Sequence, residues 1–515
     1  MTHKNLVIIL TDTQPTRMVG AYGEDWTQTP NLDRLAREGV RFDRAYTPCP
    51  LCTPARGSLM TGLLPSVNGA WGNEMTPADC QLQMGDVMRQ HGHRAALIGK
   101  WHLDGAGYHG CGVAGGGFEQ EFWHDGAQYF EQTGADRHKQ LVKALVGNAD
   151  FSQGVTAKAA AASKAHNPQA ALKELQCTEE ELWGTQVVNK ALAFLEDVGD
   201  QPFVLVVSID EPHGPFITPP EWQRGFEDTP APANYNASLA GKPALQQAQA
   251  KEFKTGEWDD FLQWRLRHLR CNAWIDSQIG RVMDAVESLH GDDTILISTS
   301  DHGDMMGSHG LLSKGAMMYD ESTRIPFIAR GPGIPAGSTC DQPVSLVDLL
   351  PTALDLAGHD IPELLHGRSI KPLLQDPQSA RLNREAIQIQ FNRFGIYHDG
   401  YGGFYPIRCA VDGRHKLAIN LFDRDELYDL EKDPHELENV IDDPAYAVER
   451  DRLHDWLLDD MDRCQDPMRG NCWRQREWRS IPTPQLFYGL ESRGGLGLPG
   501  TFAFDQRISG TGKPQ

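Results

Sequence analysis

The first 370 residues alternate short apolar runs with segments of helical periodicity. Asn5–Thr11 is an almost continuous apolar run, and similar runs occur at Arg94–Ile98, Phe203–Ile209, Thr294–Thr299 and Ile325–Arg330. Such runs are typical of strands buried on both faces of a sheet. Between them, apolar residues recur at helical spacing, as at Val187, Val188, Ala191, Leu192 and Leu195, and again at Phe261, Leu269, Ile275, Ile279 and Val282. The alternation predicts an α/β fold in which helices cover both faces of a large, mostly parallel sheet.

The pattern also places one helix start and two insertions. Thr29 and Pro30 open a helix that ends near Gly39, because they supply a cap and a preset first turn. Periodicity weakens over residues 105–180 and 228–250, which we interpret as insertions around a functional site. The alanine-rich stretch Ala157–Ala171 predicts a surface helix.

The pattern changes after Ser369. Two alternating runs, Ile407–Val411 and Lys416–Ile419, flank Asp412-Gly413, which predicts a hairpin, and Pro444–Cys464 has the periodicity of an amphipathic helix. We therefore predict three parts: a catalytic domain over residues 1–370, a C-terminal subdomain over 371–465 with a small antiparallel sheet and a helix, and an arm over 466–515. The arm is rich in Arg, Trp, Gly and Pro, and we expect it to pack on this subunit or on a second copy in a homo-oligomer.

Charge and composition narrow the choice of partners. The 515 residues include 48 basic and 70 acidic side chains, a net charge of −22, which argues against nucleic acid as a partner. No apolar stretch approaches the roughly 20 residues that cross a bilayer, so we expect no membrane association. The N-terminal apolar run is too short for a secretory signal, which predicts a cytoplasmic location, and ten scattered cysteines do not suggest a disulfide framework. An anionic substrate would need a locally positive pocket.

One segment, Pro50–Gly62, contains the sharpest candidate chemistry. Cys52 lies just ahead of Pro54, which can open a helix, so free N–H groups and the helix dipole would favour negative charge on the thiol. Arg56 follows one turn later. Local chemistry leaves three interpretations open: an activated catalytic Cys52, a buried structural cysteine, or a Cys49/Cys52 redox or zinc pair.

Two carboxylates end predicted strands far apart in the sequence. Asp12 and Asp301 would meet at one edge of a parallel sheet, where two negative charges need a cation to coexist. Oxygen ligands favour Ca²⁺, Mg²⁺ or Mn²⁺ over zinc. The alternative for an isolated aspartate at a strand end is a helix cap.

Basic side chains near the same edge could supply the positive pocket. These candidates are Lys100, His102, His213 and Lys314, and each could instead be a surface lysine or a structural core histidine. His213 follows the Phe203–Ile209 run, so it also lies at a carboxyl end, which favours a functional role. His309 falls near this edge too, and we interpret it as structural.

Several segments resemble the type I, formylglycine-dependent sulfatases of the alkaline phosphatase superfamily. Cys52-Thr53-Pro54-Ala55-Arg56 resembles the signature Cys-x-Pro-x-Arg, and Gly92–His102 resembles the second family signature. Further similar segments are Asp301-His302-Gly303, Lys314, Tyr319–Pro326, Glu426–Leu430 and Asp433-Pro434, so that the resemblance spans about residues 4–460. Thr11–Gln14, Gly99–Gly105 and Phe391–Arg393 are most similar to a bacterial branch of the family.

The resemblance implies a mechanism. Cys52 would be oxidised to formylglycine by a formylglycine-generating or anaerobic maturation enzyme, and its hydrate would attack sulfur. Asp12, Asp301, His302 and the modified Cys52 would hold one divalent ion; we expect Ca²⁺, although Thr13 stands where many sulfatases have a second aspartate, which leaves Mn²⁺ or Mg²⁺ open. Arg56, Lys100 and Lys314 would stabilise developing charge, with Asp301 a possible base for the attack.

The remaining implied roles concern proton transfer and substrate. His213 or Lys314 would protonate the leaving alcohol, and His102 would take the proton that releases sulfate. Asn73, Asp104 and Arg393 are weaker candidates for substrate contact. We expect hydrolysis of a small anionic sulfate ester of a carbohydrate to alcohol and sulfate. The alternatives are a phosphonate monoester hydrolase or phosphodiesterase of the same superfamily, and a binder of sulfated sugars without turnover.

Overall fold

We describe a computed structural model over residues 5–147, 167–253, 258–291, 293–395 and 403–479. The chain divides into two compact units, residues 1–469 and 470–515. In the second unit the described residues contain the short helix α16 (Asn471–Arg474). The predicted helix Ala157–Ala171 lies mostly outside the described residues, as does most of the predicted arm, and the domain boundaries at 370 and 465 stay predictions.

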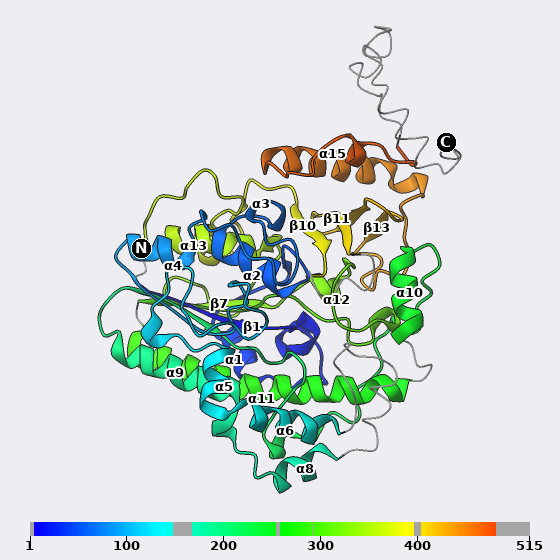
Figure 1. Cartoon of the computed structure of the whole chain (residues 1–515). Coiled ribbons are helices and arrows are strands. Elements are labelled where there is room, and N and C mark those ends of the chain that lie inside the picture. The colour runs from blue at the N-terminus through cyan, green and yellow to red at the C-terminus, as the bar shows by residue number, and fades with distance from the viewer. Residues whose placement is uncertain (1–4, 148–166, 254–257, 292, 396–402, 480–515) are drawn as a thin grey trace, which may run out of the picture. The chain divides into compact units, whose positions relative to one another are not determined.

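A mixed seven-stranded sheet forms the centre of the first unit (Figure 1). Its strands, in spatial order, are β4 (Arg94–Gly99), β5 (Phe203–Ser208), β1 (Asn5–Thr11), β6 (Thr294–Ser300), β7 (Phe327–Arg330), β2 (Val40–Phe42) and β8 (Ser338–Cys340). The first four are parallel, whereas β7 runs antiparallel to both β6 and β2. The predicted α/β fold with a mostly parallel sheet is confirmed.

Alternate residues of β1 explain why its sequence is apolar throughout. Val7 and Ile9 pack in one core with helices α1 (Pro30–Glu38), α9 (Trp183–Asp197) and α11 (Trp258–His290). Leu6, Ile8 and Leu10 pack in a second core on the opposite face, with α2 (Cys52–Thr61), α4 (Met84–Gln90) and α13 (Leu349–Leu356). A strand between two helical layers has no polar face, so every side chain must be buried.

Smaller helices and a two-stranded sheet complete this part of the unit. They are α3 (Pro65–Asn68), α5 (Gly126–Thr133), α6 (Ala135–Val146), α8 (Pro168–Glu174), α10 (Ala244–Phe253), α12 (Asp320–Thr323) and α14 (Lys371–Gln375), with the strand pair β3 (Ala45–Tyr46) and β9 (Val344–Ser345). In Figure 1, α5, α6 and α8 lie on the same side of the sheet as α9 and α11.

A second, antiparallel sheet follows in the C-terminal part of this unit. Its strands are β10 (Ile387–Arg393), β11 (Phe404–Val411), β12 (His415–Asn420) and β13 (Glu426–Asp429), and helix α15 (Ala447–Arg463) packs against β11 and β12. Val411 pairs with Lys416 across the turn at Asp412-Gly413, which confirms the predicted hairpin. The predicted helix near the C-terminus is confirmed as α15.

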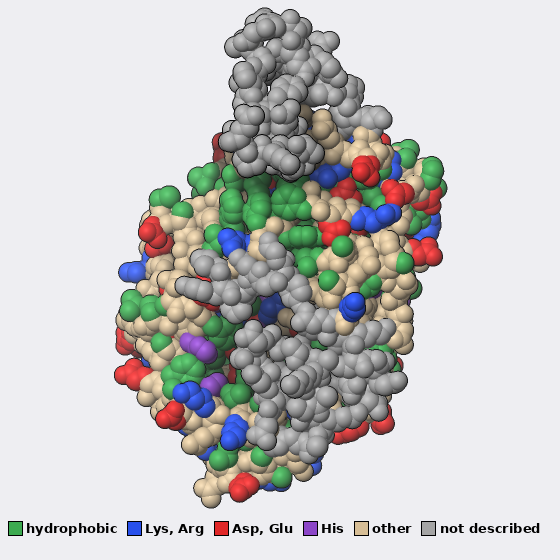
Figure 2. Space-filling model, turned by 45° about the vertical axis from the view of Figure 1, so that its right-hand side comes forward, with side chains coloured by type: hydrophobic (Ala, Val, Ile, Leu, Met, Phe, Trp, Pro, Cys, Tyr) green, Lys and Arg blue, Asp and Glu red, His purple; other side chains and the backbone are tan. Residues whose placement is uncertain are grey.

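Charged side chains of both signs lie on the surface of the described residues. On the face in Figure 2, lysine and arginine side chains are scattered among acidic ones. Within the described residues, no helix is both long and apolar enough to cross a bilayer.

Candidate active site

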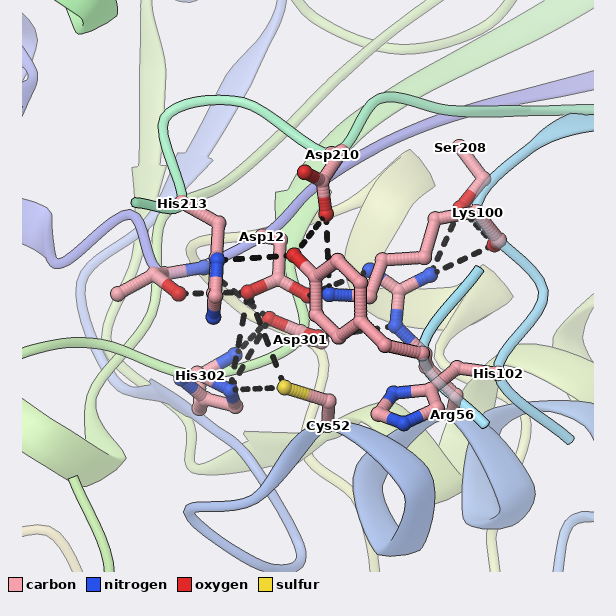
Figure 3. Close-up of polar contacts among 12 residues, drawn as sticks. Asp12, Cys52, Arg56, Lys100, His102, Ser208, Asp210, His213, Asp301 and His302 are labelled. Atoms are coloured by element: carbon pink, nitrogen blue, oxygen red, sulfur yellow. Dashed lines mark hydrogen bonds and ion pairs between the residues drawn. The ribbon is translucent and has the colours of Figure 1, made fainter. Parts of the chain in front are cut away.

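The carboxyl ends of four neighbouring parallel strands meet at one edge of the large sheet and carry polar side chains (Figure 3). Lys100 follows β4, Asp210 follows β5 by one further residue, Asp12 follows β1, and Asp301 and His302 follow β6. Thr11 pairs with Ser300, so Asp12 and Asp301 leave their strands at the same level. Register therefore brings together residues that are nearly 300 positions apart in the sequence.

Cys52 is the first residue of α2 and faces this edge. Its Sγ lies 3.2 Å from His302 Nε2 and 3.8 Å from Asp12 Oδ1. Two contacts anchor the first turn of α2: Thr53 N donates to Asn73 Oδ1 at 3.1 Å, and Thr53 Oγ1 donates to the carbonyl oxygen of His102 at 3.1 Å. The turn thus holds Cys52 against the strand ends.

Four side chains form a donor set that could hold a metal ion. One ligand atom each from Asp12, Cys52, Asp301 and His302 lies within 4.8 Å of the others, and all four residues are buried. His302 Nδ1 lies 2.9 Å from the carbonyl oxygen of Gly303, an acceptor that requires a proton on Nδ1, so Nε2 is left to bind an ion. Two carboxylates with one imidazole fit Ca²⁺, Mn²⁺ or Mg²⁺.

Cys49 lies outside this donor set. It is buried, and burial raises the pKa of its thiol. The described residues therefore place Cys52 with carboxylates and imidazole rather than in a zinc site with Cys49.

Arg56, also on α2, joins the two carboxylates. Its Nη2 donates to Asp12 Oδ2 and its Nε to Asp301 Oδ2, each at 3.0 Å. Nη1 donates to the carbonyl oxygen of Lys100 at 3.0 Å and to Ser208 Oγ at 2.7 Å. Only 2% of the Arg56 side chain is exposed, so the ion pairs are desolvated and the guanidinium is needed to hold two like charges together.

Two lysines add positive charge to the same pocket. Lys100 Nζ lies 2.8 Å from Asp12 Oδ2 and 3.0 Å from Asp210 Oδ1. Lys314 Nζ donates to Thr13 Oγ1 at 3.3 Å. Burial opposes the charge on Lys100, but Asp12 and Asp210 outweigh it and raise the pKa of this ammonium group. The lysines stay protonated and can receive an anion.

The same charges act on the acidic groups. Burial alone would raise the pKa of Asp12, yet the ammonium group of Lys100 holds it well below its usual range. Burial and Asp12 would likewise raise the pKa of Cys52, but Lys314 and Lys100 lower it well below that of an ordinary thiol. The pocket therefore favours an anion at the position of Cys52 Sγ.

Two histidines pack against Tyr108, whose ring also covers Lys100. His102 Nε2 lies 3.3 Å from Glu74 Oε1. His213 Nδ1 lies 2.7 Å from the carbonyl oxygen of Gly214 and 2.8 Å from the hydroxyl of Tyr108. Burial, followed by the ammonium groups of Lys314 and Lys100, lowers the pKa of His213 to about 4, so the imidazole is neutral in the free site.

The structure places the weaker candidates at different positions. Asn73 holds the first turn of α2, as described above. Asp104 accepts a hydrogen bond from Ala106 N at 2.9 Å within a glycine-rich loop, and Arg393 ends β10. Their contact with substrate stays a prediction. His309 is stacked on Tyr319 with ring centroids 4.0 Å apart, away from the donor set.

Sequence reasoning missed Asp210, Tyr108, Ser208 and Glu74 as members of the site. A signal existed for Asp210, which stands between the β5 run and His213, at the edge where Asp12 had already been placed. Tyr108 and Glu74 gave no signal, because neither belongs to a periodic segment.

Two family models match this chain. The model of the family described as "Sulfatase" matches residues 4–359, and that described as "N-sulphoglucosamine sulphohydrolase, C-terminal" matches residues 307–463. Together the two matches include the strands that carry the candidate site and the C-terminal sheet.

Individual sulfatases and a solved structure are similar to nearly the whole chain. The sulfatase YidJ of Escherichia coli is 38% identical over 96% of this chain and 94% of its own. An N-acetylglucosamine-6-O-sulfatase of Bacteroides thetaiotaomicron is 26% identical over 90% of this chain and 87% of its own. The crystal structure of a phosphonate monoester hydrolase from Agrobacterium radiobacter has the same fold, with a TM-score of 0.71, 24% identity, and coverage of 89% of this chain and 96% of its own.

Proposed function

The chain belongs to the sulfatase family, whose members are sulfuric ester hydrolases, and we propose that it cleaves a sulfate monoester of a carbohydrate with a formylglycine derived from Cys52 and a divalent ion. One observation carries the proposal. Cys52 begins a buried helix beside the donor set of Asp12, Asp301 and His302, with Lys100 and Lys314 in the same pocket. A nucleophile, a cation site and anion-binding groups thus meet at a single point.

The nucleophile is the hydrate of the formylglycine aldehyde, which carries two hydroxyl groups. The first hydroxyl gives its proton to Asp301 as its oxygen forms a bond to sulfur, and the bond from sulfur to the alcohol oxygen breaks. The second hydroxyl then loses its proton, its oxygen re-forms the aldehyde, and sulfate departs. Water restores the hydrate. Asp12, Asp301 and His302 would hold a divalent ion, which would supply Lewis acidity to the attacking hydroxyl and to the sulfuryl oxygens.

The protein's own side chains move protons and hold charge. Lys100 and Lys314 bind the sulfuryl oxygens, on which negative charge grows in the transition state. Burial, followed by the ammonium groups of Lys314 and Lys100, keeps His213 neutral in the free site. The negative charge of the bound ester offsets the ammonium groups, so His213 can take up a proton and pass it from Nε2 to the alcohol oxygen. His102, held by Glu74, accepts the proton of the second hydroxyl.

A carbohydrate substrate is supported by one of the relatives named above, the N-acetylglucosamine-6-O-sulfatase. A second candidate function is phosphonate monoester hydrolysis, supported by the common fold. Lys100 and His102 favour sulfate, because both belong to the second sulfatase signature.

The experiment compares matched sulfate and phosphonate aryl esters, using protein matured with a formylglycine-generating enzyme. We expect kcat/KM to be higher for the sulfate, Cys52→Ala to abolish turnover, and Cys49→Ala, the matched control three residues away, to retain it. A preference for the phosphonate would favour the second function, and full activity of Cys52→Ala would refute both. Retention of sulfated saccharides by the matured protein without product would instead identify a binding protein.

A further inference from the structure

We infer that Tyr108 is a positioning residue for the reaction proposed above: its hydroxyl joins Asp210 to His213, and its ring covers the ammonium group of Lys100. The inference rests on the proposed sulfatase function and adds to it a residue that lies outside both family signatures. Tyr108 lies in the loop after β4, six residues beyond His102.

A glycine-rich loop fixes the place of Tyr108. Gly107 and Gly110 lie on either side of it and have φ values of 97° and 81°. Residues other than glycine rarely adopt this backbone conformation. The far end of the loop is tied down by Asp125, whose Oδ2 accepts from Gly112 N at 2.8 Å and from Trp123 Nε1 at 3.1 Å. The backbone that follows Tyr108 is therefore anchored, which helps to hold the tyrosine ring in place.

The chemistry of the acceptors sets the direction of each proton around Tyr108. The carbonyl oxygen of Gly214 can only accept, so the proton of His213 must be on Nδ1, from which it also points to the tyrosine oxygen. The tyrosine hydroxyl is then free to donate to the carboxylate of Asp210. The chain of contacts runs from His213 through Tyr108 to Asp210, and it leaves Nε2 of His213 as the nitrogen that exchanges protons.

This tautomer is the one that the proposed proton transfer requires. When a doubly protonated His213 gives its Nε2 proton to the alcohol oxygen, the product is neutral imidazole with its proton on Nδ1. Tyr108 and Gly214 hold that product form, and they prevent the ring from turning so that Nδ1 faces the substrate. With Nδ1 already protonated, the neutral imidazole of His213 can take up its next proton only at Nε2.

The ring of Tyr108 has a separate effect on Lys100. The ammonium nitrogen lies 3.7 Å from the ring centroid, while Asp12 and Asp210 hold it from other directions. A cation over an aromatic face is stabilised by the ring, so Lys100 keeps one orientation. The ring of His102 also packs edge-on against Tyr108, with centroids 5.3 Å apart. One side chain thus touches the three basic residues Lys100, His102 and His213.

The two effects can be separated by substitution and by choice of leaving group. Tyr108→Phe removes the hydroxyl and keeps the ring over Lys100, whereas Tyr108→Leu removes both. We expect Tyr108→Phe to lower kcat about 10- to 100-fold for an alkyl sulfate, which needs a proton on its leaving oxygen. It should change kcat less than about threefold for 4-nitrophenyl sulfate, whose leaving group departs unprotonated. Tyr108→Leu should also raise KM for both esters.

Tyr129→Phe is the matched control. Tyr129 is also paired with a histidine, since its hydroxyl lies 3.4 Å from His138 Nδ1, but this pair is outside the site, and both kinetic constants should stay at wild-type values. Formylglycine content is measured for each variant by peptide mass. Equal losses of Tyr108→Phe on both esters, or no loss on either, would overturn the inference. A matured wild-type protein that cleaves neither ester would instead refute the proposed function itself.

Discussion

Arg56→Met offers a direct test of how the buried charges are held together. The substitution keeps the volume of a long side chain and removes the guanidinium that bonds Asp12 and Asp301. Both carboxylates are fully buried, so neither can turn to water when its partner is lost. We expect the metal-free variant to unfold at a lower temperature than the metal-free wild type.

The magnitude follows from burial and size. Removing one partner of a buried ion pair costs about 3 to 5 kcal/mol. Lys100 still pairs with Asp12 in this variant, so the cost arises at Asp301, which loses the guanidinium. At about 2.1 cal/mol/K per residue, the unit that spans residues 1–469 has an unfolding entropy of about 1 kcal/mol/K. A loss of about 4 kcal/mol therefore lowers Tm by about 4 °C.

The assay is thermal unfolding in EDTA and again in excess Ca²⁺. A cation between Asp12 and Asp301 replaces part of the missing positive charge, so Ca²⁺ should raise the Tm of Arg56→Met more than that of the wild type. Arg330→Met is the control: Arg330 also pairs with two carboxylates, but Glu38 and Glu287 are 40% and 60% exposed, and the expected cost is at most about 1 kcal/mol. Equal small losses for both variants in EDTA would refute the reasoning.

Three further predictions concern metal, substrate and pH. Asp301→Asn should weaken Ca²⁺ binding at least about tenfold by calorimetry, because it removes a charged ligand; unchanged affinity would place the ion elsewhere. Lys100→Met should lower kcat/KM for a sulfate ester by about 10²- to 10³-fold with Ca²⁺ affinity retained, and a loss confined to Ca²⁺ binding would assign the lysine to the metal instead. Burial opposes ionisation of Glu321, yet Arg17 and His309 lower its pKa from 4.5 to about 2. The ionised carboxylate therefore stabilises the fold above pH 4.5, and this stabilisation is lost as the pH falls toward 2. Urea unfolding should show the wild type losing about 3 kcal/mol more than Glu321→Gln across that range, whereas parallel curves would contradict the shift.

The long central strands could be predicted because burial on both faces leaves a continuous apolar run. The short strands β2 and β8 escaped prediction, since three residues cannot display a period. The antiparallel orientation of β7 could not be predicted either, because an apolar run looks the same in a parallel and in an antiparallel strand. Pairing with β6 and β2, which are distant in sequence, decides it.

The residues of the candidate site likewise fall into two groups, those that the sequence predicts and those that it does not. Asp12, Asp301 and Lys100 directly follow strand runs, so the geometry of a parallel sheet brings them to one edge before any contact is known. Tyr108 and Glu74 reach the site through irregular loops, whose course depends on glycine conformations and distant anchors such as Asp125. Sequence patterns report burial and periodicity, and neither constrains such loops.

Turnover measured against the aldehyde content at position 52 tests the central claim most directly. Preparations matured to different extents contain different fractions of formylglycine, which peptide mass spectrometry quantifies on the segment containing Cys52. The account predicts that kcat per protein for a sulfate ester rises in proportion to that fraction and vanishes when every Cys52 is unconverted. Equal turnover in fully converted and unconverted protein would contradict it.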